Sequence, residues 1–261
     1  MRAVGYPTPV ARVRAIYLSP VKSLGLMQAE RTALTRAGIP GDRAFVVLDD
    51  RDEVATLRRY GALARARTRY DVDRDELTMV MPGGREITAE VTDGPGHEVQ
   101  MFGEPLRGAI VEGPWAQALS ELTGVPMRLM RALGRTAQDS HAMSMLSLGS
   151  VDELSTRAEL TEPLDPRRFR NTLLIEGTGP HEEDTWVGRD VRVGTATLRV
   201  AVRDQRCSLI TKNPDSGERD LDTLRVLASY RRQDDGEVCL GVYADVVQPG
   251  DVALGDTVEP I

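Results

Sequence analysis

Short runs of apolar, strand-forming residues separated by turns recur through most of this chain. Separators rich in Gly, Pro and Asp, such as residues 40–42 and 81–84, bound these runs and are typical of the ends of strands. The runs cover residues 13–18, 44–48, 77–81, 87–91, 99–102, 172–176, 191–193, 196–202 and 238–247. Many short strands with few helices predict a β-rich α+β fold of barrel-like architecture.

Three helices are expected to interrupt the strands. Residues 115–122 carry one apolar stripe, Pro114 suits the first turn of that helix, and Gly124 suits its end. Ser150 and Glu153 have the spacing of a capping box, which predicts that a second helix begins at Ser150. A third helix is expected over residues 221–230, and the residues before about 13 are expected to be frayed.

Charge and composition exclude several classes of protein. The 261 residues are enough for one large or two small domains, and the net charge of −7 argues against general binding to nucleic acid or membrane surfaces. Apolar runs stay shorter than the roughly 18 residues that a membrane helix needs, and the first residues lack the apolar core of a signal peptide. Since only Cys207 and Cys239 could pair, a reducing, cytoplasmic location is expected.

Cys207 is the first candidate for chemistry. It follows the apolar run 198–202 and precedes the turn 213–217, so a strand is expected to deliver the thiol to the mouth of the fold while the turn folds over it. Arg203 and Arg206 lie nearby, and positive charge favours the thiolate, the form that binds metals. The alternative is a small, inert, buried residue. The same structural interpretation is preferred for Cys239, which lies in a regular strand alternation.

Other chemistries find little support. None of the three histidines has the i, i+4 spacing of a helical zinc site, and residues 81–85 form a turn between strands rather than a phosphate-binding loop. Residues 65–69 alternate basic and small side chains, which indicates a solvated edge strand.

Five segments in order resemble the MOSC family of molybdenum enzymes, which includes the amidoxime-reducing components and the C-terminal domain of molybdenum cofactor sulfurases. Two lie in the N-terminal part and resemble the MOSC N-terminal β-barrel domain; three resemble the MOSC domain proper. They are Ile16 to Ser23, Gly38 to Val47, Arg167 to Asn171, Glu183 to Trp186, and Arg206-Cys207 with Thr211, Pro214 and Gly217. The resemblance implies a MOSC β-barrel over residues 112–261, packed with a MOSC_N β-barrel-like domain over residues 1–111.

The resemblance also implies a molybdenum–molybdopterin cofactor, with Cys207 as the protein ligand to the metal, and no requirement for pyridoxal phosphate. Lys22 and Ser23, at the exit of the first strand, and Arg43 are then expected to bind the anionic pterin phosphate. For Lys22 the alternative is a solvated surface side chain. For Arg43 it is a salt bridge to Asp42 or Asp49.

Three further cofactor-binding positions follow from the same resemblance: Ser147, Arg170 and Asn171. The family has a proline between the arginine and the asparagine, and this chain lacks it, which removes a constraint on the backbone around Arg170. Ser147 could instead be a local cap of the nearby helix. Asp184 is assigned either a supporting role at the site or a purely structural one.

The function that the resemblance implies is a two-electron reduction of an N-hydroxylated or N-oxide-type small molecule at the Cys207-ligated molybdenum–pterin centre. Two cysteines cannot form a four-cysteine iron–sulfur site, so a separate ferredoxin- or haem-type electron-donor protein is expected. Two alternatives stay open. One is a sulfur-transfer or cofactor-binding module that carries a persulfide on Cys207; the other is a degenerate MOSC fold with cofactor-free chemistry.

Overall fold

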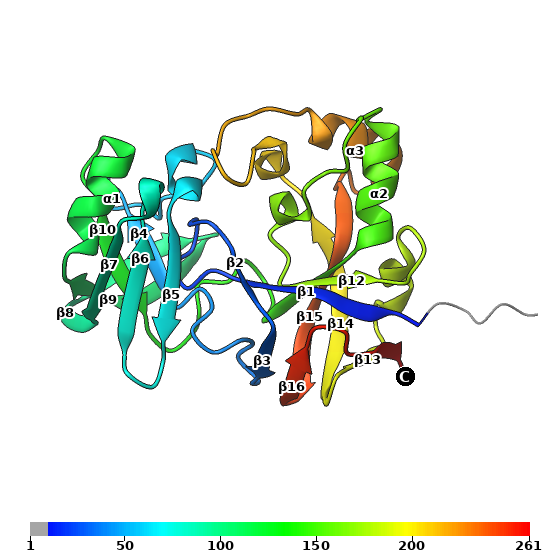
Figure 1. Cartoon of the computed structure of the whole chain (residues 1–261), viewed down its shortest axis with the longest axis horizontal. Coiled ribbons are helices and arrows are strands. Elements are labelled where there is room, and N and C mark those ends of the chain that lie inside the picture. The colour runs from blue at the N-terminus through cyan, green and yellow to red at the C-terminus, as the bar shows by residue number, and fades with distance from the viewer. Residues whose placement is uncertain (1–9) are drawn as a thin grey trace, which may run out of the picture.

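The computed structural model describes residues 10–261, and its elements gather into two lobes (Figure 1). The first lobe contains a four-stranded and a three-stranded sheet with one α-helix and two short 3-10 helices. Its elements are β4 (Phe45–Leu48), η1 (Gly61–Arg65), β5 (Arg67–Asp71), β6 (Glu76–Val80), η2 (Pro82–Gly84), β7 (Glu86–Glu90), β8 (Thr92–Met101), β9 (Glu104–Glu112), α1 (Trp115–Thr123) and β10 (Arg128–Ala132).

The second lobe contains an eight-stranded sheet and a two-stranded sheet, flanked by two α-helices. It takes its first three strands from the start of the chain: β1 (Arg12–Leu18), β2 (Met27–Ala29) and β3 (Arg31–Leu34). The others are β11 (Met143–Ser147), α2 (Leu148–Arg157), η3 (Pro166–Phe169), β12 (Leu173–Glu176), η4 (Glu182–Trp186), β13 (Asp190–Val193), β14 (Ala196–Gln205), η5 (Ser208–Thr211), α3 (Thr223–Arg231), β15 (Cys239–Gln248), β16 (Gly250–Ala253) and β17 (Val258–Pro260).

The β-rich α+β class is confirmed, and the large sheet is barrel-like rather than a closed barrel. Its strands follow the order β17-β13-β14-β15-β11-β12-β1-β2, so two ends remain in the described part of the chain. Residues 255–258 nevertheless bond to the start of β1: the Val13 amide donates to Asp256, and the Val258 amide donates to Ala11. These contacts bring β1 close to β17 without a continuous ladder between them.

Alternating burial explains why the main strands form where the apolar runs lie. In β15 the side chains of Val242, Ala244 and Val246 are buried on one face, in register with β14 on one side and β11 on the other. Each lobe has its own core around one buried tryptophan: Trp115 with Phe45 in the first, and Trp186 with Ile16 in the second. Two cores explain why the lobes meet across a cleft instead of merging.

All nine predicted strand segments and the helix from Trp115 are present, but one helix start was wrong. The first helix ends at Gly124, which adopts φ 77°, as the sequence predicts. The second begins at Leu148 with Ser147 at its N-cap position, so Ser150 lies inside the first turn. The Ser150 hydroxyl donates to Glu183 at 2.7 Å, and this tertiary contact replaces the predicted capping box.

The two lobes do not correspond to an N-terminal and a C-terminal half of the chain. Helix α1 and β10 follow residue 111 yet pack in the first lobe, while β1 to β3 pair within the second lobe. A division into domains at residues 111 and 112 stays a prediction. The predicted fraying at the start of the chain concerns mostly residues 1–9, outside the described residues; Arg12 already pairs with Glu176. Within residues 10–261 no helix has the length and apolar character needed to cross a bilayer.

Candidate functional site

A cavity of about 590 Å³ is lined by residues of both lobes. Five of the seven predicted site residues line it: Lys22, Ser23, Arg43, Arg170 and Cys207. They come from four segments that are far apart in the sequence. The volume lies within the range typical of small-molecule and cofactor sites.

Among the cationic side chains that line this cavity, Lys22, Arg43 and Arg170 influence one another's charge and form one cluster. The Lys22 ammonium pairs with Asp139 and the Arg43 guanidinium pairs with Asp42, whereas Arg170 has no carboxylate within 4 Å among residues 10–261. The Arg170 side chain donates to the Leu24 carbonyl at 2.8 Å, and Arg43 donates to the Arg170 carbonyl at 3.2 Å. Such a concentration of partly buried positive charge is suited to an anion.

The backbone at these positions explains how the cations converge. After β1 the chain turns sharply, with Ser23 at φ 74°, and the Lys22 amide donates to the Phe45 carbonyl at 2.8 Å. Arg43 adopts φ 49° at the end of a turn anchored by buried Asp42, which accepts the Ser19 amide at 2.7 Å. Two non-glycine residues in the left-handed region cost conformational energy, and such strain often accompanies functional sites.

Arg170 also lies in the left-handed region, at φ 57° and ψ 24°. A residue that precedes proline is restricted to extended conformations. The proline that this chain lacks after Arg170 would therefore disfavour the conformation observed here. Two residues further along the chain, Thr172 lines the cavity, whereas Asn171 does not.

Burial and mutual repulsion shape the electrostatics of the cluster. Burial, together with the charge of Arg43, lowers the pKa of Arg170 to about 10. Burial also lowers the pKa of Lys22, although Asp139 opposes that shift. The Asp139 side chain is 57% exposed to solvent but lies between the cavity walls; desolvation there would raise its pKa, but the Lys22 charge and hydrogen bond hold the pKa below its ordinary value. All three shifts follow from desolvated charges held near one another.

Cys207 presents its thiol at the cavity, as the sequence predicts. Strand β14 ends two residues earlier, η5 begins directly afterwards, and the residue is exposed while Cys239 is buried. The alternative of a buried residue is therefore wrong for Cys207. Both nearby arginines are engaged in ion pairs: Arg206 pairs with Asp204 at 2.8 Å and Arg203 with Asp184 at 3.2 Å.

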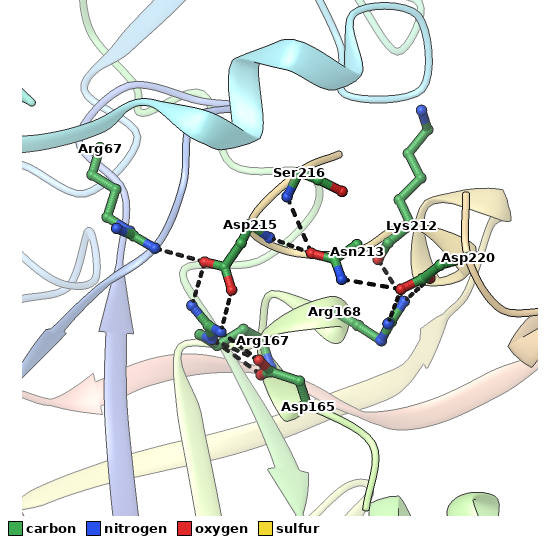
Figure 2. A network of polar contacts seen from close by, with 9 residues as sticks. All are labelled: Arg67, Asp165, Arg167, Arg168, Lys212, Asn213, Asp215, Ser216 and Asp220. Carbon is green, nitrogen blue, oxygen red and sulfur yellow. Dashed lines mark hydrogen bonds and ion pairs between the residues drawn. The ribbon is translucent and has the colours of Figure 1, made fainter. Parts of the chain in front are cut away.

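The segment that follows Cys207 is fixed to the first lobe by an ionic bridge (Figure 2). The Asp215 carboxylate accepts from Arg67 of β5 at 2.6 Å and from both terminal nitrogens of Arg167 at 2.9 and 2.8 Å. Arg167 also pairs with Asp165, and the combined contacts raise the pKa of Arg167 and lower that of Asp215. One carboxylate thus connects the two lobes beside the cavity.

A second contact fixes the same segment to η3 and η1. Arg168 donates to the Lys212 carbonyl at 2.8 Å and to Asp220 at 2.7 and 2.6 Å (Figure 2). Gly217 lies so close to Gly61 that a Cβ atom on Gly217 would be 1.8 Å from the Gly61 carbonyl oxygen. The turn 213–217 therefore touches both lobes, and its predicted position over the Cys207 thiol stays a prediction.

Two predicted cofactor contacts lie behind the cavity wall. Asn171 is buried, donates to Asp204 at 3.1 Å and accepts from Arg206 at 2.8 Å, so it holds side chains that do line the cavity. Ser147 is buried and bonds to Thr178 at 2.7 Å. Ser147 does not line the cavity, so direct binding of the cofactor by Ser147 stays a prediction. Asp184 pairs with Arg203 and Arg231 and is itself absent from the cavity lining, in keeping with a structural role.

Several cavity residues carry no signal in the sequence. Gln138 and Asp139 lie on the connection between β10 and β11, and the buried Gln138 side-chain nitrogen has no hydrogen-bond partner among the described residues. Asp204 is 2% exposed, and burial raises its pKa to about 6 despite the opposing charge of Arg206 and a hydrogen bond from Tyr243. A buried, unpaired amide and a carboxyl that titrates near neutrality are both characteristic of ligand sites.

Two protein-family models together match nearly the whole length of this chain. Residues 10–126 match the MOSC N-terminal beta barrel domain, and residues 133–259 match the MOSC domain. A molybdenum cofactor sulfurase of Oryza sativa subsp. japonica is 25% identical over 90% of this chain and 33% of its own length. Mitochondrial amidoxime-reducing component 1 of Mus musculus is 26% identical over 95% of this chain and 82% of its own.

The chain thus spans about a third of the sulfurase and most of the amidoxime-reducing component. Among solved structures, the YUAD protein from Bacillus subtilis superposes with a TM-score of 0.48 and 13% identity, over 96% of this chain and 95% of that one.

Proposed function

The chain belongs to the MOSC family, and from this premise we propose that it is a molybdenum-cofactor-dependent oxidoreductase. The proposed reaction is the two-electron reduction of an N-hydroxylated or N-oxide-type small molecule. One observation carries the proposal: an exposed thiol and three cations from separate segments line one cavity between the lobes.

The residues present fit a molybdenum–pterin cofactor. Lys22, Arg43 and Arg170 supply charge for a phosphate group, and the unpaired Gln138 amide supplies a buried donor. Cys207 supplies a soft thiol of the kind that binds transition metals. No group of three or more His, Cys, Asp or Glu side chains within residues 10–261 is arranged to hold a metal, so further ligands would have to come from the cofactor.

In this proposal the protein binds, orients and supplies protons. The cofactor, when bound, would supply two-electron redox chemistry and oxygen-atom exchange. Reduction of an N-hydroxyl compound to the amine consumes two electrons and two protons and releases water. Asp204 lies beside Tyr243 on the cavity wall, and burial raises the pKa of the Asp204 carboxyl to about 6, so Asp204 can hold a proton in mildly acidic solution. The electrons would come from a separate electron-donor protein.

Metal analysis tests the proposal directly. Protein made in a host that synthesises the cofactor should contain molybdenum by inductively coupled plasma analysis and yield a fluorescent pterin on extraction. Cys207→Ser should lose most of the metal and of the reduction of a benzamidoxime probe by dithionite-reduced viologen. Cys239→Ser is the matched control and should retain both. Wild-type molybdenum content and turnover in Cys207→Ser would eliminate the thiol as the metal ligand.

A sulfur-transfer function is the second candidate, because the relatives include molybdenum cofactor sulfurases and the Cys207 thiol is exposed. In that case Cys207 would carry a persulfide and the protein would contain no stoichiometric molybdenum. A persulfide-selective alkylation probe, read by mass spectrometry of the Cys207 peptide, separates the two functions. Persulfide on wild-type protein without molybdenum would favour sulfur transfer over reduction.

A further inference from the structure

The Asp139 side chain supplies a negative charge at the part of the cavity lined by Lys22, Arg43 and Arg170. It lies on the connection between β10 and β11, where the chain passes from the first lobe to the second. Its carboxylate pairs with the Lys22 ammonium, and the same ammonium donates to the Ala137 carbonyl at 2.8 Å. In the described structure Asp139 therefore takes a position at the Lys22 ammonium that an anionic ligand would otherwise use.

The connection is fixed in place, so this position is a built feature of the fold. The Ala137 amide donates to the Arg43 carbonyl at 2.8 Å, and the Ala137 side chain is fully buried. Gly38 approaches the Ala142 carbonyl so closely that a Cβ atom on Gly38 would be 2.6 Å from its oxygen. Contacts on both sides of Asp139 thus hold the connection against the segments that carry Lys22 and Arg43.

The two carboxylates at the cluster differ in how firmly they are held. Asp42 is fully buried, accepts the Ser19 amide and pairs with Arg43. The Asp139 side chain is 57% exposed in the open cavity, and within residues 10–261 the side chain it bonds to is that of Lys22. Asp139 is consequently the carboxylate that an incoming anion can displace, since rotation of one side chain frees Lys22.

The charge balance then discriminates between anions. With both carboxylates in place the cluster of Lys22, Arg43 and Arg170 retains one net positive charge, and displacement of Asp139 leaves two. A phosphate monoester carries close to two negative charges at neutral pH and can pair with more than one cation at once. A monoanion at Lys22 would only replace the Asp139 carboxylate by another single charge, without a gain in charge pairing there.

We propose, on the basis of the proposed function, that Asp139 is a specificity-determining residue that competes for the anion site, admits phosphate dianions and excludes monoanions. The ligand class is thus a phosphate monoester, and the discrimination comes from this chain's own carboxylate. Removal of the carboxylate should strengthen phosphate binding and allow monoanions to bind.

Calorimetric titration of cofactor-free, full-length protein tests this inference, with inorganic phosphate and acetate as probes at pH 8. Asp139→Asn should bind phosphate about tenfold more tightly than wild type, and should bind acetate where wild type does not. Asp73→Asn is the control, because it makes the same change in net charge at an exposed turn and should behave as wild type. Asp139→Ala serves as a second variant if Asp139→Asn does not fold.

Equal phosphate affinity in wild type and Asp139→Asn would overturn the inference, and so would a gain that Asp73→Asn shares. If wild type contains molybdenum while the Asp139 variants behave as wild type, the proposed function stands and the inference fails. If the predicted gain is measured in a protein that never acquires molybdenum, the inference stands and the proposed function fails. Absence of phosphate binding in every variant would overturn both the anion site and the role of Asp139.

Discussion

Substitution of Gly217 by alanine should open the contact between the turn 213–217, which follows Cys207 in the chain, and the first lobe. Gly217 has φ 73°, and a Cβ atom there would lie 1.8 Å from the Gly61 carbonyl oxygen. The obstructing atoms belong to the backbone, so no side chain can rotate away. The turn or η1 must move by more than about an ångström to accept the methyl group.

The expected cost has two parts. A left-handed conformation costs a non-glycine residue roughly 1–2 kcal/mol. Forcing a methyl group into a filled space costs about 1–3 kcal/mol more. Together they predict that the free energy of unfolding of Gly217→Ala falls by roughly 2–5 kcal/mol, or a melting temperature lower by about 4–20 °C for a chain of this size.

Gly236→Ala is the matched control. Gly236 has φ 89°, and among residues 10–261 no other segment comes within 4 Å of the position that an alanine methyl group would take, so only the conformational part of the cost applies. Urea denaturation gives the free energy of unfolding of each variant, and the rate of Cys207 modification by Ellman's reagent should rise only in Gly217→Ala. Equal destabilisation of the two variants, with unchanged thiol reactivity, would refute the close contact between Gly217 and Gly61.

Three further predictions concern charged residues. Arg170→Ala should weaken phosphate binding about 10- to 100-fold in calorimetry, since a charge-assisted contact contributes roughly 1.5–3 kcal/mol; unchanged affinity would locate the anion elsewhere. Asp204 has a pKa of about 6 in the folded protein and about 4 when unfolded, so the folded state binds the extra proton, and the contribution of Asp204 to stability falls by roughly 2 kcal/mol as pH rises from 4 to 6. Asp204→Asn should not show this fall, and a pH-independent difference in urea midpoints would contradict it. Asp215→Asn should lower the free energy of unfolding by about 1 kcal/mol at low salt and less at 1 M NaCl, because its ion pairs with Arg67 and Arg167 are half-exposed.

The strands that the sequence predicts are those whose apolar alternation matches one-sided burial, such as β15. Several strands lack this signal. β11 is buried at every position although it contains Ser144 and Ser147, because Ser144 bonds to Thr172 beside β12. β2, β3, β16 and β17 have only three or four residues each. Tertiary pairing, rather than local pattern, creates these strands.

In the candidate site, too, some residues can be predicted from the sequence and others cannot. Cys207, Lys22, Arg43 and Arg170 lie in motifs, so family resemblance predicts them, and the cavity brings them together. Asp139 lies on a connection without a recognisable pattern, and its proximity to Lys22 depends on how the lobes meet. Such residues become visible only in three dimensions, because no local rule relates positions so far apart in the chain.

The position of β1 in the second lobe has a consequence for synthesis on the ribosome. β1 leaves the ribosome first, but its partner strand β12 begins only at Leu173. At about 5–20 residues per second, the edge of β1 that pairs with β12 stays open for roughly 10–30 seconds, although Ile16 can pair earlier with Ala29 of β2. The first lobe has its own core and can form during this time. The nascent chain therefore carries an unprotected apolar strand ahead of a folded lobe, which is the kind of segment that chaperones bind and that aggregates when expression is fast.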